Sequence, residues 1–289
     1  MDPSARIETA LQQAMARASG LGSPAGLRAA GQHAVFPGGA RIRPQLCLAV
    51  AAACGDARLR SAGGAATAIE LLHCASLVHD DLPCFDDAAM RRGVPSVHHK
   101  FGQPLAVLTG DALIVLAFET LAHDVELTPQ KLASLLMIVC RATGMPHGIA
   151  AGQAWELEET VPLRQYQRAK TGALFVAATT AGAVAADANP AEWTALGELI
   201  GEAYQIADDI RDAVSTMEEI GKPVGQDVAL SRPSAVREFG LDGAYGRLEE
   251  LIGAAIGSIP NFPGAAELRQ SLMQQTARLT PKNQARVAA

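Results

Sequence analysis

Two clusters of aspartates are the strongest sign of chemistry in this sequence. The first reads HDDLPCFDD over residues 79–87 and follows an apolar segment. Pro83 disfavours helical geometry at Leu82, so we expect the preceding helix to end there and Asp86 to lie in the loop beyond. Residues six apart in an unbroken helix point in different directions, at about 100° per residue, whereas a loop can return Asp86 to Asp80. These two carboxylates are therefore expected to converge.

The second cluster reads YQIADDIRD over residues 204–212, near the end of a predicted helix. Asp208 and Asp212 are four residues apart and share one helix face, while Asp209 lies to the side. Two stacked carboxylates repel each other unless they share a hard cation, and Mg²⁺ suits such a site because it takes further ligands from substrate phosphates. One such cluster alone is more often solvated surface. Two of them, each followed by a long connection, indicate a metal site for a phosphate-bearing substrate.

Four short motifs supply the cations that a diphosphate would need. They are GGARIRP at 38–44, RRG at 91–93, KTG at 170–172 and GKP at 221–223. An Arg fork binds phosphate oxygens in pairs, and Lys adds a point charge. Each motif alone is more often a solvated charge, but together with metal they could balance two diphosphates. The sequence shows neither the spacing of a zinc-binding His pair nor a Ser/His/Asp or Cys/His arrangement.

Helix-length segments with periodic apolar residues, most of them bounded by Gly or Pro, must position these motifs. After a first helix capped by Ser4, the expected helices cover residues 41–53, 62–81, 105–123, 129–142, 149–158, 163–170, 173–186, 191–213, 242–258 and 264–279. No convincing alternating strand pattern is present, so we expect an all-α bundle and a single domain over residues 1–289. Two longer connections, 82–104 and 214–233, are expected to carry function.

Composition excludes several classes of protein. Of 289 residues, 49% are hydrophobic and 4% aromatic, which supports a large helical core and argues against an all-β fold. The formal net charge of -6 argues against a nucleic-acid partner, because phosphate backbones need a basic face. Five cysteines without a CxxC pair indicate free thiols and a cytoplasmic location. We expect neither a signal peptide nor a transmembrane segment.

The motifs, in their order, resemble those of the polyprenyl synthetase family of trans-isoprenyl diphosphate synthases. The resemblance rests on GGARIRP, ELLHCASLVHDDLPCFDDAAMRRG, KTGALF, YQIADDIRD and GKPVGQD, and it covers essentially the whole chain. Within the family, the sequence is most similar to the twenty-carbon type from photosynthetic and carotenogenic bacteria. The resemblance implies an isoprenoid-synthase helical bundle around a central apolar cavity, assembled as a homodimer.

The resemblance also implies site residues, carried over motif by motif. Three Mg²⁺ ions are expected with a bound allylic diphosphate, held by the aspartates of the two clusters: Asp80, Asp81, Asp86, Asp208 and Asp212, with Asp81 in a supporting place. The catalytic positions are Lys170, Thr171, Gln205 and Lys222. The substrate-binding positions are Arg43, His73, Arg91 and Arg92, with Ala75 and Ser76 along the path of the growing chain.

Three departures from the family pattern bear on substrate binding. The lysine usual in the first glycine motif is Ala40 here, and Arg41 should point elsewhere on its helix. A stretch that is usually rich in glycine and lysine reads SRPS at 231–234, and Glu156 stands where Asp is common. Because the metal-binding positions are intact, these changes should affect substrate affinity more than the chemistry.

The reaction implied is the condensation of an allylic diphosphate, farnesyl diphosphate or shorter, with isopentenyl diphosphate. Ala75 and Ser76 lie about one helical turn from Asp80 and are small, so the cavity wall should admit a twenty-carbon product, geranylgeranyl diphosphate. In family members that stop at fifteen carbons, an aromatic residue usually stands at one of these positions.

Three alternatives remain at this point. A farnesyl diphosphate synthase would share every motif and differ in the depth of the cavity. A terpene cyclase would share the fold, but Arg43, His73 and Arg92 argue against it, because a cyclase has no second substrate. A non-catalytic partner subunit would be expected to lose aspartates, which this chain keeps, and the missing cation at Ala40 is the feature that favours it.

Overall fold

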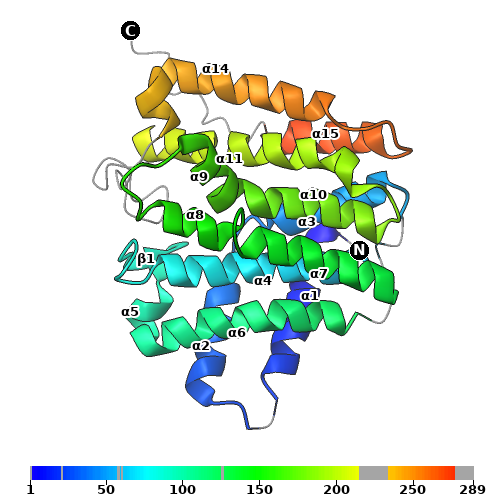
Figure 1. The fold of residues 1–289 in the computed structure, drawn as a ribbon. Helices are drawn as coiled ribbons and strands as arrows, with labels where there is room; N and C mark the ends of the chain where they lie inside the picture. Colours follow the sequence, from blue (N-terminus) through cyan, green and yellow to red (C-terminus); the bar gives the residue numbers. More distant parts are fainter. Residues whose placement is uncertain are drawn as a thin grey trace.

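The computed structural model is a bundle of helices, and it describes residues 2–20, 22–56, 59, 61–124, 127–214 and 234–276. Figure 1 shows the helices stacked in rows, with α14 and α15 at one edge and α2 at the opposite edge. The elements, in chain order, are α1 Pro3–Ala18, α2 Ala25–Val35, α3 Ile42–Ala53, α4 Ala62–Asp80, β1 Met90–Arg91, β2 Val94–Pro95, α5 Val97–Phe101, α6 Gln103–Ala122, α7 Pro129–Thr143, α8 Ile149–Trp155, α9 Leu163–Gln167, η1 Arg168–Gly172, α10 Ala173–Ala185, η2 Pro190–Trp193, α11 Thr194–Val214, α14 Ala235–Gly257 and α15 Ala265–Thr276.

Helices α4 and α10 form the centre of the main hydrophobic core. Both are rich in Ala and carry buried residues around most of their circumference, because α4 packs on α6, α3 and α10, and α10 packs on α3, α11 and α7. Small side chains let the backbones approach. At Gly182 an added Cβ would lie 2.4 Å from the carbonyl oxygen of Cys47, so α10 and α3 meet at a distance that only glycine permits. This tight centre fixes the ends of α4 and α10, which carry site residues.

A second apolar cluster joins α11 to α14. Ile206 and Ile210 of α11 pack with Leu248 and Leu251 of α14. The buried carboxylate of Asp209 accepts a hydrogen bond of 2.7 Å from the backbone N–H of Ala235, close to the first turn of α14. Apolar packing and this hydrogen bond therefore hold α11 in place where it carries the second aspartate cluster.

The all-α expectation is confirmed, with differences in local detail. Helix α2 was not among the expected helices, and the connection 82–104 folds into tight turns, a two-stranded pair and the short helix α5. The helix expected from residue 191 begins with the 3₁₀ turn η2, and α14 begins earlier than expected, with a break at Gly240 where φ is 70°. The connection 214–233 lies almost wholly outside the described residues, and the single domain stays a prediction.

Helix α6 is the one described helix that is long and apolar enough, by length and composition, to cross a membrane. Asp111 interrupts its sequence at the middle, and the helix packs along α4 in the bundle. Four of its buried residues, Leu113, Leu116, Ala117 and Leu121, belong to the main core. Those contacts are typical of a core helix of a bundle.

Candidate functional site

A pocket with a volume of 590 Å³ opens between the end of α4 and the helices α8, η1, α10 and α11. One part of its wall is charged, with Asp80, Asp86, Lys170, Asp208 and Asp212. Another part is apolar and is formed by Leu72, Ala75, Ile114, Ile149 and Leu174. A volume of this size is typical of a small-molecule site. The pocket therefore suits a ligand with a charged head and an apolar tail.

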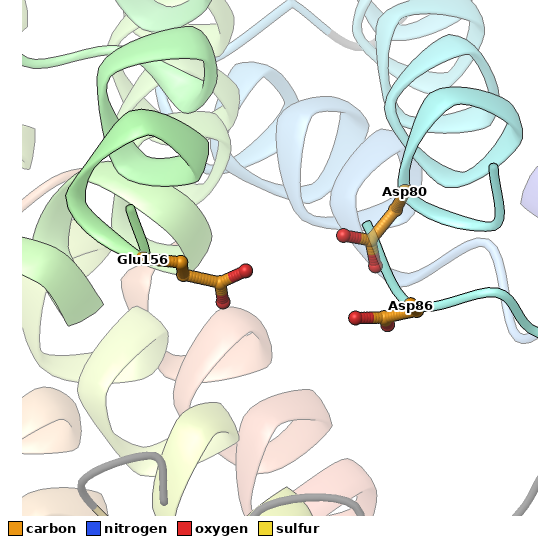
Figure 2. Close-up of side chains that lie close together, drawn as sticks. All are labelled: Asp80, Asp86 and Glu156. Carbon is orange, nitrogen blue, oxygen red and sulfur yellow. The ribbon is translucent and has the colours of Figure 1, made fainter. Parts of the chain in front are cut away.

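The first aspartate cluster folds back on itself at the end of α4. The helix ends at Asp80, and the backbone N–H of Asp86 donates to the carbonyl oxygen of Asp80 at 3.0 Å. This hydrogen bond closes the turn that Pro83 begins and returns Asp86 to the side of Asp80. Carboxylate oxygens of Asp80, Asp86 and Glu156 lie within 4.8 Å of one another (Figure 2).

Glu156 is the member of this group to which sequence reasoning gave no role beyond a departure from the family pattern. It follows α8 directly, and Figure 2 shows its carboxylate facing Asp80 and Asp86. Its Oε1 lies 2.5 Å from Nζ of Lys170, which is also 3.4 Å from Oδ1 of Asp80. The sequence feature that could have identified Glu156 is its position four residues after Gly152. A Cβ added at Gly152 would lie 2.3 Å from the backbone nitrogen of Lys170, so this glycine lets α8 approach η1 closely.

The donor set fits a hard divalent cation. The three clustered carboxylates offer oxygen atoms alone, as Mg²⁺ prefers, and Asp208 and Asp212 line the same pocket from α11. Asp80 is 15% and Asp208 48% exposed at the side chain, so these two aspartates can be reached by water or a ligand. The carboxylates of Asp80 and Asp86, with Asp208 and Asp212, would hold such an ion.

Asp81 takes a different place from its neighbours. It is 2% exposed and forms an ion pair with Arg91, whose Nε donates to Oδ1 at 2.8 Å. Burial raises the pKa of Asp81 to about 6, while the hydrogen bond and charge of Arg91 oppose that rise. Arg91 Nη2 also lies 3.8 Å from Oδ2 of Asp80. Asp81 is therefore not a member of the carboxylate cluster of Asp80, Asp86 and Glu156, and its ion pair holds Arg91 close to Asp80.

A second group of cations lies around the glycine turn before α3. Nη1 of Arg43 lies 3.3 Å from Nε2 of His73, and its guanidinium stacks over the ring of Phe175 at 4.5 Å. Burial lowers the pKa of His73 well below its usual value, and the charges of Arg43 and Arg92 lower it further. His73 is therefore neutral near pH 7 and accepts from Arg43. Nε of Arg43 is buried without a hydrogen-bond partner among the described residues.

The glycine turn itself is shaped around Arg92. Nη1 of Arg92 donates to the carbonyl oxygen of Gly38 at 2.8 Å. At Gly39 the φ angle is 134°, a conformation that favours glycine, and an added Cβ would lie 2.8 Å from Cζ of Arg92, so the end of that side chain would have to shift. Arg92 is not among the residues lining the pocket, whereas Arg43 is.

Arg41 does not replace the cation missing at Ala40. Its side chain is buried and bonded to Glu8 at 2.8 Å, to Glu70 at 2.7 Å and to the carbonyl oxygen of Val35 at 2.6 Å. This network ties the glycine turn to α1, α2 and α4. The expectation that Arg41 points elsewhere matches its position.

The π-helical turn η1 carries Lys170 and Thr171 toward the pocket. Such turns interrupt the regular helix and are frequent at functional sites. Oγ1 of Thr171 donates to Oε1 of Gln205 at 2.6 Å, and Nε2 of Gln205 donates to Oδ1 of Asp209 at 2.8 Å. The buried Asp209 thereby fixes Gln205, which in turn orients Thr171 across the pocket.

The structure brings most of the expected site residues together in this one pocket. Those that line it are Arg43, His73, Ala75, Ser76, Asp80, Asp86, Arg91, Lys170, Thr171, Gln205, Asp208 and Asp212. Asp81 and Arg92 do not line the pocket. Asp81 accepts a hydrogen bond from Arg91, and Arg92 donates to the carbonyl oxygen of Gly38. Lys222 lies outside the described residues. Glu156 and Tyr166 lie outside every motif, and their contacts at this site could not be predicted from the motifs.

Fold and site together define a helical protein whose pocket combines clustered carboxylates, separate groups of cations and an apolar wall. Residues 24–262 match the polyprenyl synthetase family model. The chain is 53% identical over 284 residues to a geranylgeranyl diphosphate synthase of Cereibacter sphaeroides, covering 98% of each chain. It is 50% identical over 265 residues to the Rhodobacter capsulatus enzyme of the same name, covering 92% of each.

Solved structures agree with this assignment. A geranyltransferase from Helicobacter pylori, solved in complex with magnesium and isoprenyl diphosphate, superposes with a TM-score of 0.80 at 28% identity, covering 96% of this chain and 98% of the other. The family match and the two bacterial relatives lead to one conclusion. The chain belongs to the polyprenyl synthetase family.

Proposed function

We propose that this chain is a trans-prenyltransferase that condenses farnesyl diphosphate and shorter allylic diphosphates with isopentenyl diphosphate, forming geranylgeranyl diphosphate and diphosphate. The observation that carries the proposal is the single pocket that joins converging carboxylates to an apolar wall in which Ala75 and Ser76 are small. The two relatives at 53% and 50% identity, both named geranylgeranyl diphosphate synthase, support the product length.

The allylic diphosphate binds between the two aspartate clusters in this proposal. Asp80 and Asp86 face Asp208 and Asp212 across it, and we expect three Mg²⁺ ions there with ligand bound. Bound Mg²⁺ stabilises the negative charge that develops on the leaving diphosphate. Lys170, Arg91 and Lys222 add positive charge around the same group.

The pocket must also protect the allylic cation that forms when the C–O bond breaks. Leu72, Ile114 and Leu174 exclude water from the hydrocarbon chain, which prevents water from capturing the cation. Thr171 and Gln205, fixed by their mutual hydrogen bond, place oxygen dipoles near the reacting carbon. Ala75 and Ser76 leave space for the chain to lengthen.

Isopentenyl diphosphate binds at the second group of cations. Arg43 and Arg92 hold its diphosphate, and the neutral imidazole of His73 orients Arg43. The double bond of isopentenyl diphosphate then attacks the allylic carbon, and the departed diphosphate takes the proton that is lost. No side-chain base is needed for this step.

We also propose a homodimer that works in the cytoplasm. Exposed apolar side chains gather on α6, where Leu108 is 53% and Val115 65% exposed, and such patches commonly mark interfaces. All five cysteines carry free thiols, which agrees with a reducing compartment.

The test is incubation of the purified protein with Mg²⁺, isopentenyl diphosphate and each allylic diphosphate in turn, followed by chromatography of the dephosphorylated products. We expect geranylgeraniol as the main product from farnesyl diphosphate. Accumulation of farnesol alone would indicate a farnesyl diphosphate synthase. Hydrocarbon formed without isopentenyl diphosphate would indicate a cyclase, and no turnover would indicate a non-catalytic subunit.

A further inference from the structure

We propose that Tyr166 is a positioning residue: its hydroxyl holds the carboxylate of Glu156 so that Lys170 can leave that carboxylate and bind the allylic diphosphate. The inference rests on the proposed function of the pocket. Tyr166 belongs to none of the sequence motifs. The role that we assign to it is to raise the affinity of the pocket for the allylic diphosphate.

The geometry joins the three side chains at one atom. The hydroxyl of Tyr166 donates to Oε1 of Glu156 at 2.6 Å, and Nζ of Lys170 lies 2.5 Å from the same oxygen. The ammonium group also lies 6.0 Å from the centre of the Tyr166 ring. Nε2 of Gln153 donates to the other oxygen, Oε2, at 3.3 Å. Lys170 and Tyr166 therefore share one carboxylate oxygen.

The shared carboxylate of Glu156 is largely buried, so the loss of either donor cannot be made up fully by water. The side chain of Glu156 is 9% exposed and Tyr166 is 6% exposed, so water can replace little of what Lys170 supplies. The nearby carboxylates of Asp80 and Asp86 add repulsion. A buried carboxylate that loses its cation is strongly penalised unless other donors remain.

Lys170 must nevertheless move when a diphosphate binds. Its Nζ already lies between Glu156 and Asp80, at 2.5 Å and 3.4 Å, and its flexible stem allows it to turn toward the pocket. When it turns, the Tyr166 hydroxyl stays on Oε1 and continues to satisfy it. Without that hydroxyl, Glu156 retains Lys170 more strongly, and the diphosphate binds less tightly.

The first experiment uses Tyr166→Phe, which keeps the ring and removes the hydroxyl. Binding of a non-reactive farnesyl thiodiphosphate with Mg²⁺, measured by calorimetry without isopentenyl diphosphate, should weaken about five- to tenfold. The KM for farnesyl diphosphate should rise by a similar factor, while the KM for isopentenyl diphosphate stays unchanged. Tyr245→Phe, a change in the apolar cluster of α11 and α14, is the matched control and should alter none of these values.

A double-variant cycle separates positioning from general stability. Glu156→Gln removes the charge that holds Lys170, so adding Tyr166→Phe to it should change thiodiphosphate affinity by less than twofold. Unchanged affinity in Tyr166→Phe, an equal rise of both KM values, or a full effect of Tyr166→Phe in the Glu156→Gln background would each overturn the inference. Failure of the proposed function would show differently, as absence of prenyl transfer in the unmodified protein.

Discussion

The carboxylate cluster shows which contacts can be predicted from the sequence and which need the structure. It consists of Asp80, Asp86 and Glu156. The two aspartates belong to a motif whose proline predicts the turn that joins them, so their convergence could be predicted from the sequence. Glu156 comes from a different helix, and its approach depends on the close contact at Gly152. The hydrogen bond from Tyr166 is equally non-local in origin, because it depends on how α9 faces α8. Such contacts across helices carry no short sequence pattern.

The carboxylates should be essential through the metal that they hold. Asp80→Asn or Asp208→Asn should lower kcat/KM by about 10²- to 10³-fold, since the loss of one metal ligand removes roughly 3–4 kcal/mol of transition-state stabilisation. Steady-state rates with Mg²⁺, with Mn²⁺ and with EDTA measure this. Asp242→Asn, on exposed α14, serves as control and should leave the rate unchanged. Full turnover in EDTA, or by both site variants, is incompatible with a metal-dependent reaction.

Ala40 should limit the affinity for isopentenyl diphosphate. The buried network of Arg41 leaves the position without the usual cation. Ala40→Lys should lower the KM for isopentenyl diphosphate about five- to thirtyfold, corresponding to ~1–2 kcal/mol for a charge-assisted contact, with little change in the KM for farnesyl diphosphate. Initial-rate kinetics with each substrate varied in turn give both values. An unchanged KM for isopentenyl diphosphate would show that another group already fills the role.

Helix α4 links the metal site to the product length, because one continuous helix carries both. Its Ala-rich sequence and its end near Pro83 could be predicted from propensity and turn chemistry. Helix α2 was missed because Gly26 and Gly31 weaken its helical pattern, and packing between α4, α5 and α6 supports it in the fold. The pair β1 and β2 has two residues in each strand, which is too short for an alternating pattern.

Ala75 should set the length of the product. It is buried in the main core and lines the pocket, about one turn of α4 from Asp80. Ala75→Phe or Ala75→Tyr should shift the main product from geranylgeranyl to farnesyl diphosphate, because forcing a chain against an aromatic ring costs more than the ~1–3 kcal/mol of ordinary overpacking. Chromatography of dephosphorylated products measures the ratio.

The control for this change is Ala254→Phe on the exposed side of α14, which should retain the twenty-carbon product. If Ala75→Phe retains it too, the wall that limits the chain lies elsewhere in the pocket.

The molecule as a whole follows from the repeated apolar periodicity, which predicted an all-α bundle. What periodicity could not give is the order in which helices pack, such as α10 against α3, since that depends on close contacts at single glycines. The family resemblance implied the bundle and the pocket, and it also implied a dimer. In the dimer that we propose, the exposed apolar residues on α6 would form the interface.

Charges on the exposed face of α6 should separate the protomers. Leu108→Glu with Val115→Glu places two carboxylates where the proposed interface would exclude water, so the dimer should dissociate at micromolar concentration. Sedimentation velocity measures the mass of the particle. Met273→Glu on α15, 58% exposed in the unmodified chain, is the control and should stay dimeric. A monomeric unmodified protein, or a charged variant that remains a dimer, would place the interface elsewhere or exclude it.

A crystal structure with Mg²⁺ and non-reactive farnesyl thiodiphosphate tests the central claim most directly, because it locates head and tail together. The account predicts the diphosphate between the pair Asp80 and Asp86 and the pair Asp208 and Asp212, with Lys170 turned toward it and the hydrocarbon passing Ala75. A diphosphate bound away from both aspartate clusters, or a chain directed away from Ala75, would contradict it.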